Sequence, residues 1–285
     1  MMTLHPSRGS DRLRRATRSI NESLSDGAQM ADRDEDKNAA RIEREREFYD
    51  KIGDSRVKQP GFVPHAFHFY LSKQSEIVKT AFAPRQAGQF LEIGSTTWID
   101  WIERSGIRPA KLTCINISER ELEKGINASV HTEIKPDFRV MDAHVLEFPD
   151  QSLDVVFGGG ILHHLEYERA LREIKRVLKP GGIMVFNEPM DINPVGRIAR
   201  RINPHYRTED EMPFRMRELE ICQSIFSTEF YFEQFTSVFA GAVSARIFPS
   251  PSNVLTRSAF RVDEALLQLF PALGPYYRYV LIVGE

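Results

Sequence analysis

The residues of this chain that could do chemistry lie where short apolar runs end. Glu92 and Gly94 close a run that starts at Phe90, and Ser95 and Thr96 lead from there toward an apolar helical face. A small-residue turn lets backbone N–H groups approach a ligand, and a carboxylate can accept hydrogen bonds from that ligand. We therefore expect a nucleotide pocket here, against the alternative that this strand–turn–helix unit binds nothing.

Polar or small residues also follow the later apolar runs. Parallel strands end at a common edge of their sheet, and such sheets bind ligands beyond the carboxyl ends of their strands. Residues at these ends are therefore expected to surround one pocket: Glu92, Asn116, Asp142, Gly158, Gly159, Gly160 and Glu188.

Two adjacent histidines, His163 and His164, come shortly after the glycines that end the fourth run. The unperturbed pKa of histidine is about 6.5, so an imidazole at this place is suited to take a proton from a substrate hydroxyl near neutral pH. A structural histidine between Leu162 and Leu165 is the alternative that the sequence leaves open. No spacing of ligand residues indicates a metal site, so we expect none.

Strands separated by helices are predicted from residue 89 onward. Ser118 and Glu121 have the spacing of a capping box, as do Thr97 and Asp100, and each pair should open a helix. Apolar runs and alternation predict the strands. They are expected near residues 90–92, 111–115, 138–141, 153–157 and 183–186, within 229–239, and at 277–283.

Strands that alternate with helices indicate an α/β fold. We expect a Rossmann-like, seven-stranded, mostly parallel sheet with helices on both faces, an N-terminal helical lead-in and an insertion before the last strand. A disordered or mobile tail is predicted over residues 1–38, the lead-in over 39–88 and the main domain over 89–285. The start of the tail is rich in Arg and Ser, so a transit peptide remains an alternative. Helices are expected at 39–52, ending at 82, at 118–126, 167–178, 195–202, 215–226 and 262–270, with a loop at 203–213.

Composition limits the kind of partner and compartment. The 285 residues are 41% hydrophobic, which allows a substantial core, and the net charge of -2 gives no global basic field for nucleic acid. Cys114 and Cys222 offer no disulfide framework and are expected to be core thiols, which fits a reducing compartment. No apolar run approaches the ~20 residues that span a bilayer. We therefore expect a cytoplasmic protein that does not bind nucleic acid, and homo-oligomerisation stays open.

The ordered set of strand ends resembles the class I S-adenosylmethionine-dependent methyltransferases. Leu91-Glu-Ile-Gly94 looks like the first motif of that family, and Met141-Asp-Ala143 looks like its adenine-side motif. Residues 152–157 with Leu162-His-His-Leu165 look like the fourth-strand motif, and Arg176-Val-Leu-Lys-Pro-Gly-Gly182 is the most specific match. The resemblance covers about residues 62–285, and stretches after strand five resemble a small-molecule branch near the quinone- and lipid-methylating enzymes.

The resemblance implies methyl transfer from S-adenosylmethionine to a small-molecule acceptor, apolar or anionic, through an oxygen, nitrogen or carbon nucleophile. The protein would hold acceptor and methyl group in near-attack geometry. The implied catalytic candidates are His163, His164 and Glu188, and the acceptor side is expected over residues 189–275. The implied cofactor contacts are Glu92, Gly94, Ser95, Thr96, Asn116, Ile117, Asp142, Ala143, Gly158 and Gly159.

Two places depart from the family pattern. Ser95 and Thr96 stand where further glycines are usual, and a non-glycine residue at positive φ costs about 1–2 kcal/mol, so we expect either another path of the turn or local strain. Asn116 stands where the family has an acid that binds the ribose hydroxyls. A neutral acceptor there should weaken cofactor binding by several-fold.

Three other functions remain open on the sequence alone. A dehydrogenase would need G-x-G-x-x-G after the first strand, where this chain has only Gly94. By family resemblance, a nucleic-acid methyltransferase usually carries an acid/Asn-Pro-Pro-aromatic motif after strand four, where this chain has three glycines. A methyltransferase-like fold that serves as an inactive partner subunit is the non-enzymatic alternative.

Overall fold

The structure is a computed structural model that describes residues 40–41, 43–44, 46–47, 61–193 and 212–285. Residues 1–44 and 45–285 form two compact units, and the fold described below is that of the second. The predicted tail, the predicted helix at 195–202 and most of the predicted loop at 203–213 lie outside the described residues. The described residues between 40 and 47 are helical, as the lead-in prediction requires.

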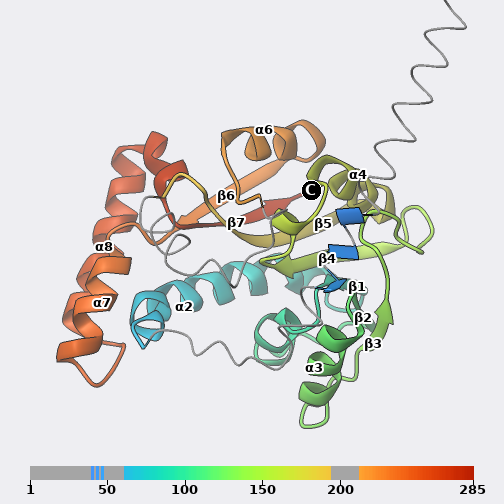
Figure 1. Cartoon of the computed structure of the whole chain (residues 1–285), viewed down its shortest axis with the longest axis horizontal. Helices are drawn as coiled ribbons and strands as arrows, with labels where there is room; N and C mark the ends of the chain where they lie inside the picture. The colour runs from blue at the N-terminus through green and yellow to red at the C-terminus, as the bar shows by residue number, and fades with distance from the viewer. Residues whose placement is uncertain (1–39, 42, 45, 48–60, 194–211) are drawn as a thin grey trace, which may run out of the picture. The chain divides into compact units, whose positions relative to one another are not determined.

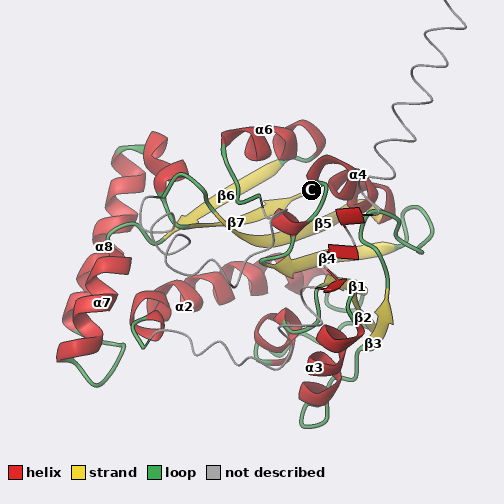
Figure 2. Ribbon diagram, viewed as in Figure 1, coloured by secondary structure: helices red, strands yellow, loops and turns green. Residues whose placement is uncertain are grey.

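Seven strands form one sheet in the order β3-β2-β1-β4-β5-β7-β6 (Figure 1). Neighbours from β3 to β5 pair in parallel, whereas β7 is antiparallel to both β5 and β6. The predicted seven-stranded, mostly parallel sheet is thus confirmed, and Figure 2 shows its strands in yellow. The strands are β1 (Gln89–Ile93), β2 (Lys111–Asn116), β3 (Asp137–Val140), β4 (Leu153–Gly159), β5 (Leu178–Pro189), β6 (Thr228–Glu233) and β7 (Tyr279–Gly284).

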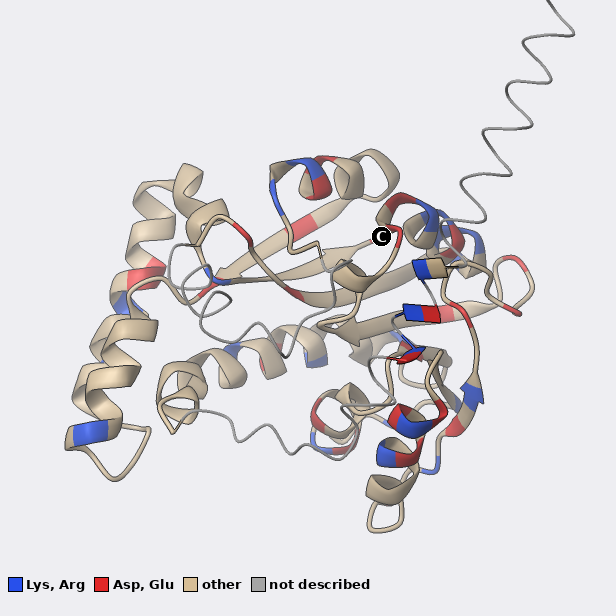
Figure 3. Cartoon of the chain, in the orientation of Figure 1, with Lys and Arg blue, Asp and Glu red and all other residues tan. Residues whose placement is uncertain are grey.

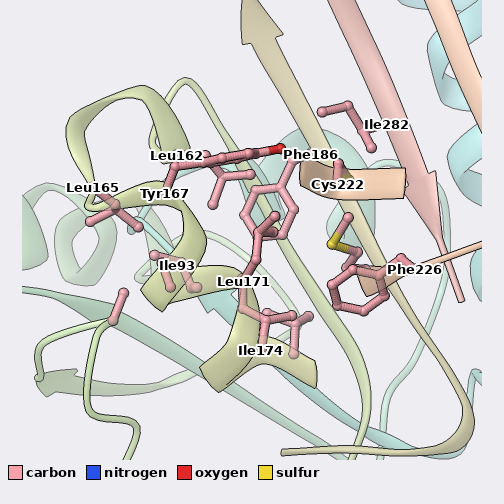
Figure 4. Packing of buried hydrophobic residues seen from close by; sticks show 14 of the residues in the cluster. Ile93, Leu162, Leu165, Tyr167, Leu171, Ile174, Phe186, Cys222, Phe226 and Ile282 are labelled. Carbon is pink, nitrogen blue, oxygen red and sulfur yellow. The ribbon is translucent and has the colours of Figure 1, made fainter. Parts of the chain in front are cut away.

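Helices cover both faces of the sheet, as expected. On one face α4 and α6 bury side chains such as Leu171 and Cys222 against the strands (Figure 4). On the other face α2 and the helical turn Ile99–Glu103 pack around Phe82 and Phe157. No helix in the described ranges is long and apolar enough to cross a bilayer. The helices are α2 (Val63–Phe82), α3 (Glu119–Ser129), α4 (Tyr167–Val177), α6 (Met216–Ile225), α7 (Ser237–Ile247) and α8 (Val254–Leu269).

The segment before the last strand differs from the prediction. α7 forms where the sequence analysis predicted no helix, and α8 begins at Val254 rather than near Val262. α7 is rich in small residues, because Gly241 packs directly against α2: a Cβ at that position would lie 2.7 Å from the Cβ of Ala66. The buried face of α7 is formed mainly by small residues such as Gly241 and Ser244, and its large apolar residues lie on the exposed face, so the usual pattern of a buried apolar face is missing. β5 also begins earlier than predicted, at Leu178 rather than near residue 183.

A buried carboxylate joins the three helices α2, α7 and α8. Asp263 of α8 is fully buried and accepts the backbone N–H groups of Phe235, Thr236 and Ser237 at 3.0, 2.7 and 3.1 Å. The hydroxyl of Tyr70 in α2 donates to the same carboxylate at 2.7 Å. A carboxylate at a helix N-terminus satisfies N–H groups that have no partner within the helix. Asp263 therefore fixes the start of α7 to both neighbouring helices.

Candidate functional site

A cavity lies beyond the carboxyl ends of β1, β2 and β4, where the topology of such sheets places ligands. Residues from all three strand ends line it, so the sheet brings distant parts of the sequence together as predicted. The predicted residues that line it are Gly94, Ser95, Thr96, Asn116, Ile117, Ala143, Gly159, Gly160 and His164. Glu92, Asp142, Gly158, His163 and Glu188 were also predicted, and they lie behind this lining.

The turn after β1 takes a path that needs only one glycine. Gly94 has a φ of 124°, and a Cβ there would meet nothing closer than 3.7 Å, so the position is open toward the cavity. Ser95 and Thr96 are absent from the described residues with positive φ, so the strain considered for them does not arise. The Ser95 hydroxyl instead donates to the carbonyl of Glu121 in α3 at 2.8 Å. Serine thus ties the turn to α3.

Glu92 holds this turn from behind instead of lining the cavity. Its carboxylate is fully buried and accepts the N–H groups of Thr97 and Trp98 at 2.6 and 3.3 Å. The capping box predicted for Thr97 and Asp100 is therefore wrong: a charged acceptor from β1 is a stronger cap than a hydroxyl, and Asp100 pairs with Arg104. Ser118, by contrast, caps α3 by accepting the N–H of Glu121 at 3.2 Å, as expected.

Burial raises the pKa of Glu92 to about 7, although hydrogen bonds from Cys114, Thr97 and Trp98 partly oppose the shift. The ordinary pKa of glutamate is near 4.5. A carboxyl whose pKa is raised by folding keeps its proton in the folded state after the unfolded chain has lost it. Its contribution to stability therefore falls as the pH rises between these two values.

We expect the free energy of unfolding of the wild type to fall by up to about 3 kcal/mol between pH 4.5 and pH 7 relative to Glu92→Gln. Glutamine keeps the oxygen that accepts from Thr97 but cannot ionise. Urea unfolding at a series of pH values measures the difference. Parallel pH profiles for the two proteins would show that the buried carboxyl is already ionised at low pH.

Asn116 ends β2 and faces the cavity with part of its amide. Its Oδ1 accepts the N–H of Ser118 at 3.0 Å, which fixes the side chain across the start of α3. Glu121, on the first turn of α3, lines the same cavity, and its carboxylate pairs with Lys124. The sequence analysis missed Glu121 as a site residue. The capping spacing from Ser118 was the available signal, because it places Glu121 on the turn nearest the strand end.

Asp142 organises the loop after β3 without lining the cavity. Its carboxylate accepts the backbone N–H and the Nδ1–H of His144 at 2.9 and 2.6 Å. The N–H of Glu166 donates to Nε2 of His144 at 2.8 Å, so the imidazole proton is on Nδ1. Burial alone would raise the pKa of Asp142, but the bonds from His144 outweigh it and lower the pKa. The loop held in this way presents Met141 and Ala143 to the cavity.

The three glycines at the end of β4 differ in what they contact. A Cβ on Gly158 would lie 2.5 Å from the carbonyl oxygen of Ile93, so this glycine allows β1 and β4 to approach. Gly159 and Gly160 line the cavity, and Gly160 has a φ of 65°. Of the three glycines expected at this strand end, Gly159 and Gly160 thus line the cavity and Gly158 serves the packing of the sheet. The remaining lining residues that the prediction did not include are Ile93, Thr97, Ile115, Met141, Ile161 and Leu165.

His163 and Glu188 form a buried pair beside the cavity. Nδ1 of His163 lies 2.6 Å from Oε2 of Glu188, and the other carboxylate oxygen accepts the N–H groups of Ile161 and Leu162 at 3.1 and 2.9 Å. Glu188 is fully buried, and the exposed fraction of His163 is 8%. The ring of His164 packs against that of His163, with centroids 4.1 Å apart, and His164 is the histidine that lines the cavity. Glu188 thus lies behind His163 and can act only through it.

No group of three metal-ligating side chains occurs among the residues that the structure describes. The residues around the cavity suit an organic ligand with one flat apolar part and one polar part. Ile117, Met141, Ala143 and Leu165 offer apolar walls, whereas Asn116, Glu121 and the β1 turn offer hydrogen-bonding groups. Such a division is typical of pockets for nucleosides and other small molecules.

Comparison with known proteins adds to this geometry. The family model described as "Methyltransferase domain" matches residues 91–186, which run from β1 to β5. The chain is 30% identical to 27-O-demethylrifamycin SV methyltransferase of Amycolatopsis mediterranei over 109 residues, 37% of this chain and 40% of that protein. It is 25% identical to the O-methyltransferase cnsE of Penicillium expansum over 194 residues, 60% of this chain and 70% of that protein.

The fold is also similar to that of a solved geranyl diphosphate methyltransferase in complex with S-adenosylmethionine. The TM-score is 0.51 at 15% identity, and the match covers 75% of this chain and 84% of that one. The chain spans less than half the length of the rifamycin enzyme and a larger part of the other two. The segment that the family model matches contains every strand end around the cavity.

Proposed function

We propose that this chain, which belongs to the class I S-adenosylmethionine-dependent methyltransferases, transfers the methyl group of that cofactor to a small-molecule acceptor. The observation that carries the proposal is the cavity at the ends of β1, β2 and β4 with the His163–Glu188 pair beside it. The relatives that methylate small molecules support the choice of acceptor class.

The residues around the cavity fit the cofactor. We assign the nucleoside to the apolar walls around Ala143 and Ile117, and the ribose hydroxyls to Asn116 and Glu121. The open backbone at Gly94 is assigned to the amino-acid end, where no side chain blocks approach. When bound, the cofactor supplies an electrophilic methyl group on a sulfonium centre. Placing that group and the acceptor in near-attack geometry is the main task of this chain.

His163 is assigned the role of base for an acceptor that must lose a proton. Glu188 lies within hydrogen-bond distance of Nδ1, so we assign the other ring nitrogen, Nε2, to the acceptor. The carboxylate also stabilises the imidazolium that forms, as in other carboxylate–histidine pairs. Three backbone N–H groups, those of residues 161–163, fix the carboxylate, so the base is oriented before the acceptor arrives. His164 is assigned to the cofactor side.

The acceptor side is assigned to residues 189–275, of which the structure describes 189–193 and 212–275. The described N–H of Met212 donates to the carbonyl of His163 at 2.9 Å, which brings this region to the proposed base. We infer an apolar or anionic small molecule as the acceptor. The buried thiols Cys114 and Cys222 support a cytoplasmic location, and homo-oligomerisation is left to direct measurement.

Calorimetric titration with S-adenosylmethionine and S-adenosylhomocysteine, followed by a screen of acceptors with labelled cofactor, tests the function. Binding of both cofactor forms and label transfer to a small phenol, alcohol or amine are expected. Cofactor binding without transfer to any acceptor would favour the inactive partner subunit. Binding of NADH in place of either ligand would favour an oxidoreductase and overturn the proposal.

Asn116→Asp is expected to tighten binding of S-adenosylhomocysteine by several-fold at most. An aspartate can keep one oxygen on the N–H of Ser118 and turn the other toward the ribose hydroxyls, where a charged acceptor makes the stronger bond. Calorimetry measures the change, and Asn127→Asp on the far end of α3 is the matched control. Weaker binding would show that Glu121 already supplies a charged acceptor for the ribose hydroxyls and that, in the variant Asn116→Asp, the new carboxylate at position 116 and the carboxylate of Glu121 repel each other.

A further inference from the structure

α7 and α8 form a hairpin that presents large apolar side chains to solvent. On α7, Phe239, Val243 and Ile247 are exposed, and their spacing of four residues places them in one row along the helix. The exposed fractions of Phe239 and Ile247 are 62% and 64%. The row continues across the connecting loop, because Val254 begins α8 and is 71% exposed. A continuous apolar row of this kind on a soluble surface usually marks an interaction site.

The charges beside the apolar row are arginines, whereas the two carboxylates of α8 have other partners: Asp263 is fully buried and Glu264 pairs with Lys73. Residues 237–262 contain three arginines, Arg246, Arg257 and Arg261, and no aspartate or glutamate, whereas the whole chain has a net charge of -2. All three arginines are exposed, and among the described residues none forms an ion pair with a carboxylate. Arg257 lies over the ring of Phe69 at 5.7 Å. In Figure 3 the ribbons of α7 and α8 are mostly tan, with few charged residues of either sign.

The exposed apolar row belongs to a hairpin that packs closely against the rest of the fold. Gly241 of α7 packs against Ala66, and Asp263 fixes the start of α7 to α2 and α8. The side of the hairpin that faces α2 is thus closely packed, and the apolar row lies on the opposite side, toward solvent. An apolar row flanked by arginines matches the chemistry of an anionic bilayer surface: aliphatic and aromatic groups enter the interface, and guanidinium groups meet phosphates.

We propose that the hairpin face, defined as Phe239, Val243, Ile247, Val254 and the three arginines, docks the protein on the surface of an anionic lipid bilayer. Self-association through this face is disfavoured, because a two-fold interface would bring the unpaired arginines of both copies together. The hairpin lies within residues 189–275, the region assigned to the acceptor side, but no residue of the hairpin face lines the cavity, and vesicle binding is measured without cofactor or acceptor.

Co-sedimentation of the full chain with lipid vesicles tests the proposal. The protein should sediment with vesicles that contain phosphatidylserine and stay in solution with vesicles of phosphatidylcholine alone, and added salt should weaken the binding. The triple variant Arg246→Gln/Arg257→Gln/Arg261→Gln should lower the partition coefficient ~100-fold, at about fivefold per arginine. The triple variant Phe239→Ser/Ile247→Ser/Val254→Ser should lower it as well.

Ile126→Ser/Val130→Ser on α3 is the matched control, since both side chains are exposed and lie outside the hairpin. It should bind the vesicles as the wild type does, and circular dichroism should be unchanged in all variants. Sedimentation with neither kind of vesicle, or equally with both, would overturn the proposal. So would a dimer in light scattering that only the serine variant of the hairpin dissociates, or binding to soluble polyglutamate as tight as to vesicles, which would point to a protein partner.

Discussion

His163→Ala is expected to lower the rate of methyl transfer ~10²–10⁴-fold while the affinity for S-adenosylhomocysteine stays the same. The reason is that the two histidines have different positions and are assigned different roles. His163 is oriented by Glu188 and lies behind the cavity lining, whereas His164 lines the cavity. Loss of the oriented imidazole should therefore affect the proton transfer and leave cofactor contacts in place. Turnover with labelled cofactor and calorimetry with the demethylated product measure the two quantities separately.

His164→Ala is the matched comparison and should show the opposite pattern. Its affinity for S-adenosylhomocysteine should fall, and its turnover at saturating cofactor should stay within about tenfold of the wild type. The wild-type rate should also fall on the acid side, because a protonated imidazole cannot accept a proton. Near-native turnover in both variants would remove histidine base catalysis and indicate a carbon nucleophile or an acceptor that is already an anion.

The second large effect is expected for Gly125→Ala in α3. A Cβ at this position would lie 2.2 Å from the carbonyl oxygen of Ser95 and 2.6 Å from the ring of Phe138. Alanine favours a helix over glycine by about 1 kcal/mol, but overpacking of this kind costs about 1–3 kcal/mol and the closest atom is backbone. The collision would also push the β1 turn away from the cavity. We therefore expect a lower Tm and an affinity for S-adenosylhomocysteine that is weaker by about tenfold or more.

Gly61→Ala provides the control, because a Cβ there would have nothing within 4 Å. Tm and cofactor affinity should be unchanged in that protein. A rise in the Tm of Gly125→Ala, as helix propensity alone predicts, together with wild-type affinity would show that α3 can move away from Ser95 without cost to the site.

The sequence was sufficient for the parts of the fold that local pattern determines. Strands β1 to β4 and helices α3 and α4 are encoded in apolar runs, capping residues and periodic faces, and each was predicted near its observed bounds, whereas β5 was predicted but extends further at both ends. α7 was not, because its packing depends on a glycine that touches Ala66, which is far away in the chain. Close contact of this kind needs small residues on the buried face, so the buried face of α7 carries no row of large apolar residues.

The site was predictable in location and less so in detail. The rule that ligands bind beyond the carboxyl ends of parallel strands brought Asn116, Ala143 and Gly159 to one cavity. It could not tell which polar residues face the ligand and which support the backbone behind it. Glu92 and Glu188 both proved to be acceptors for backbone N–H groups, a role that appears only when the turns they hold are seen in three dimensions.

Asp263 has a consequence for the order in which the molecule comes apart. One carboxylate receives hydrogen bonds from Tyr70, Thr236 and Ser237, so the junctions of α2, α7 and α8 share a single acceptor. None of the three helices can leave its place without removing a partner from the other two. They should therefore open together as one cooperative unit, and their slowest amides should exchange with solvent at a common rate that differs from that of the sheet.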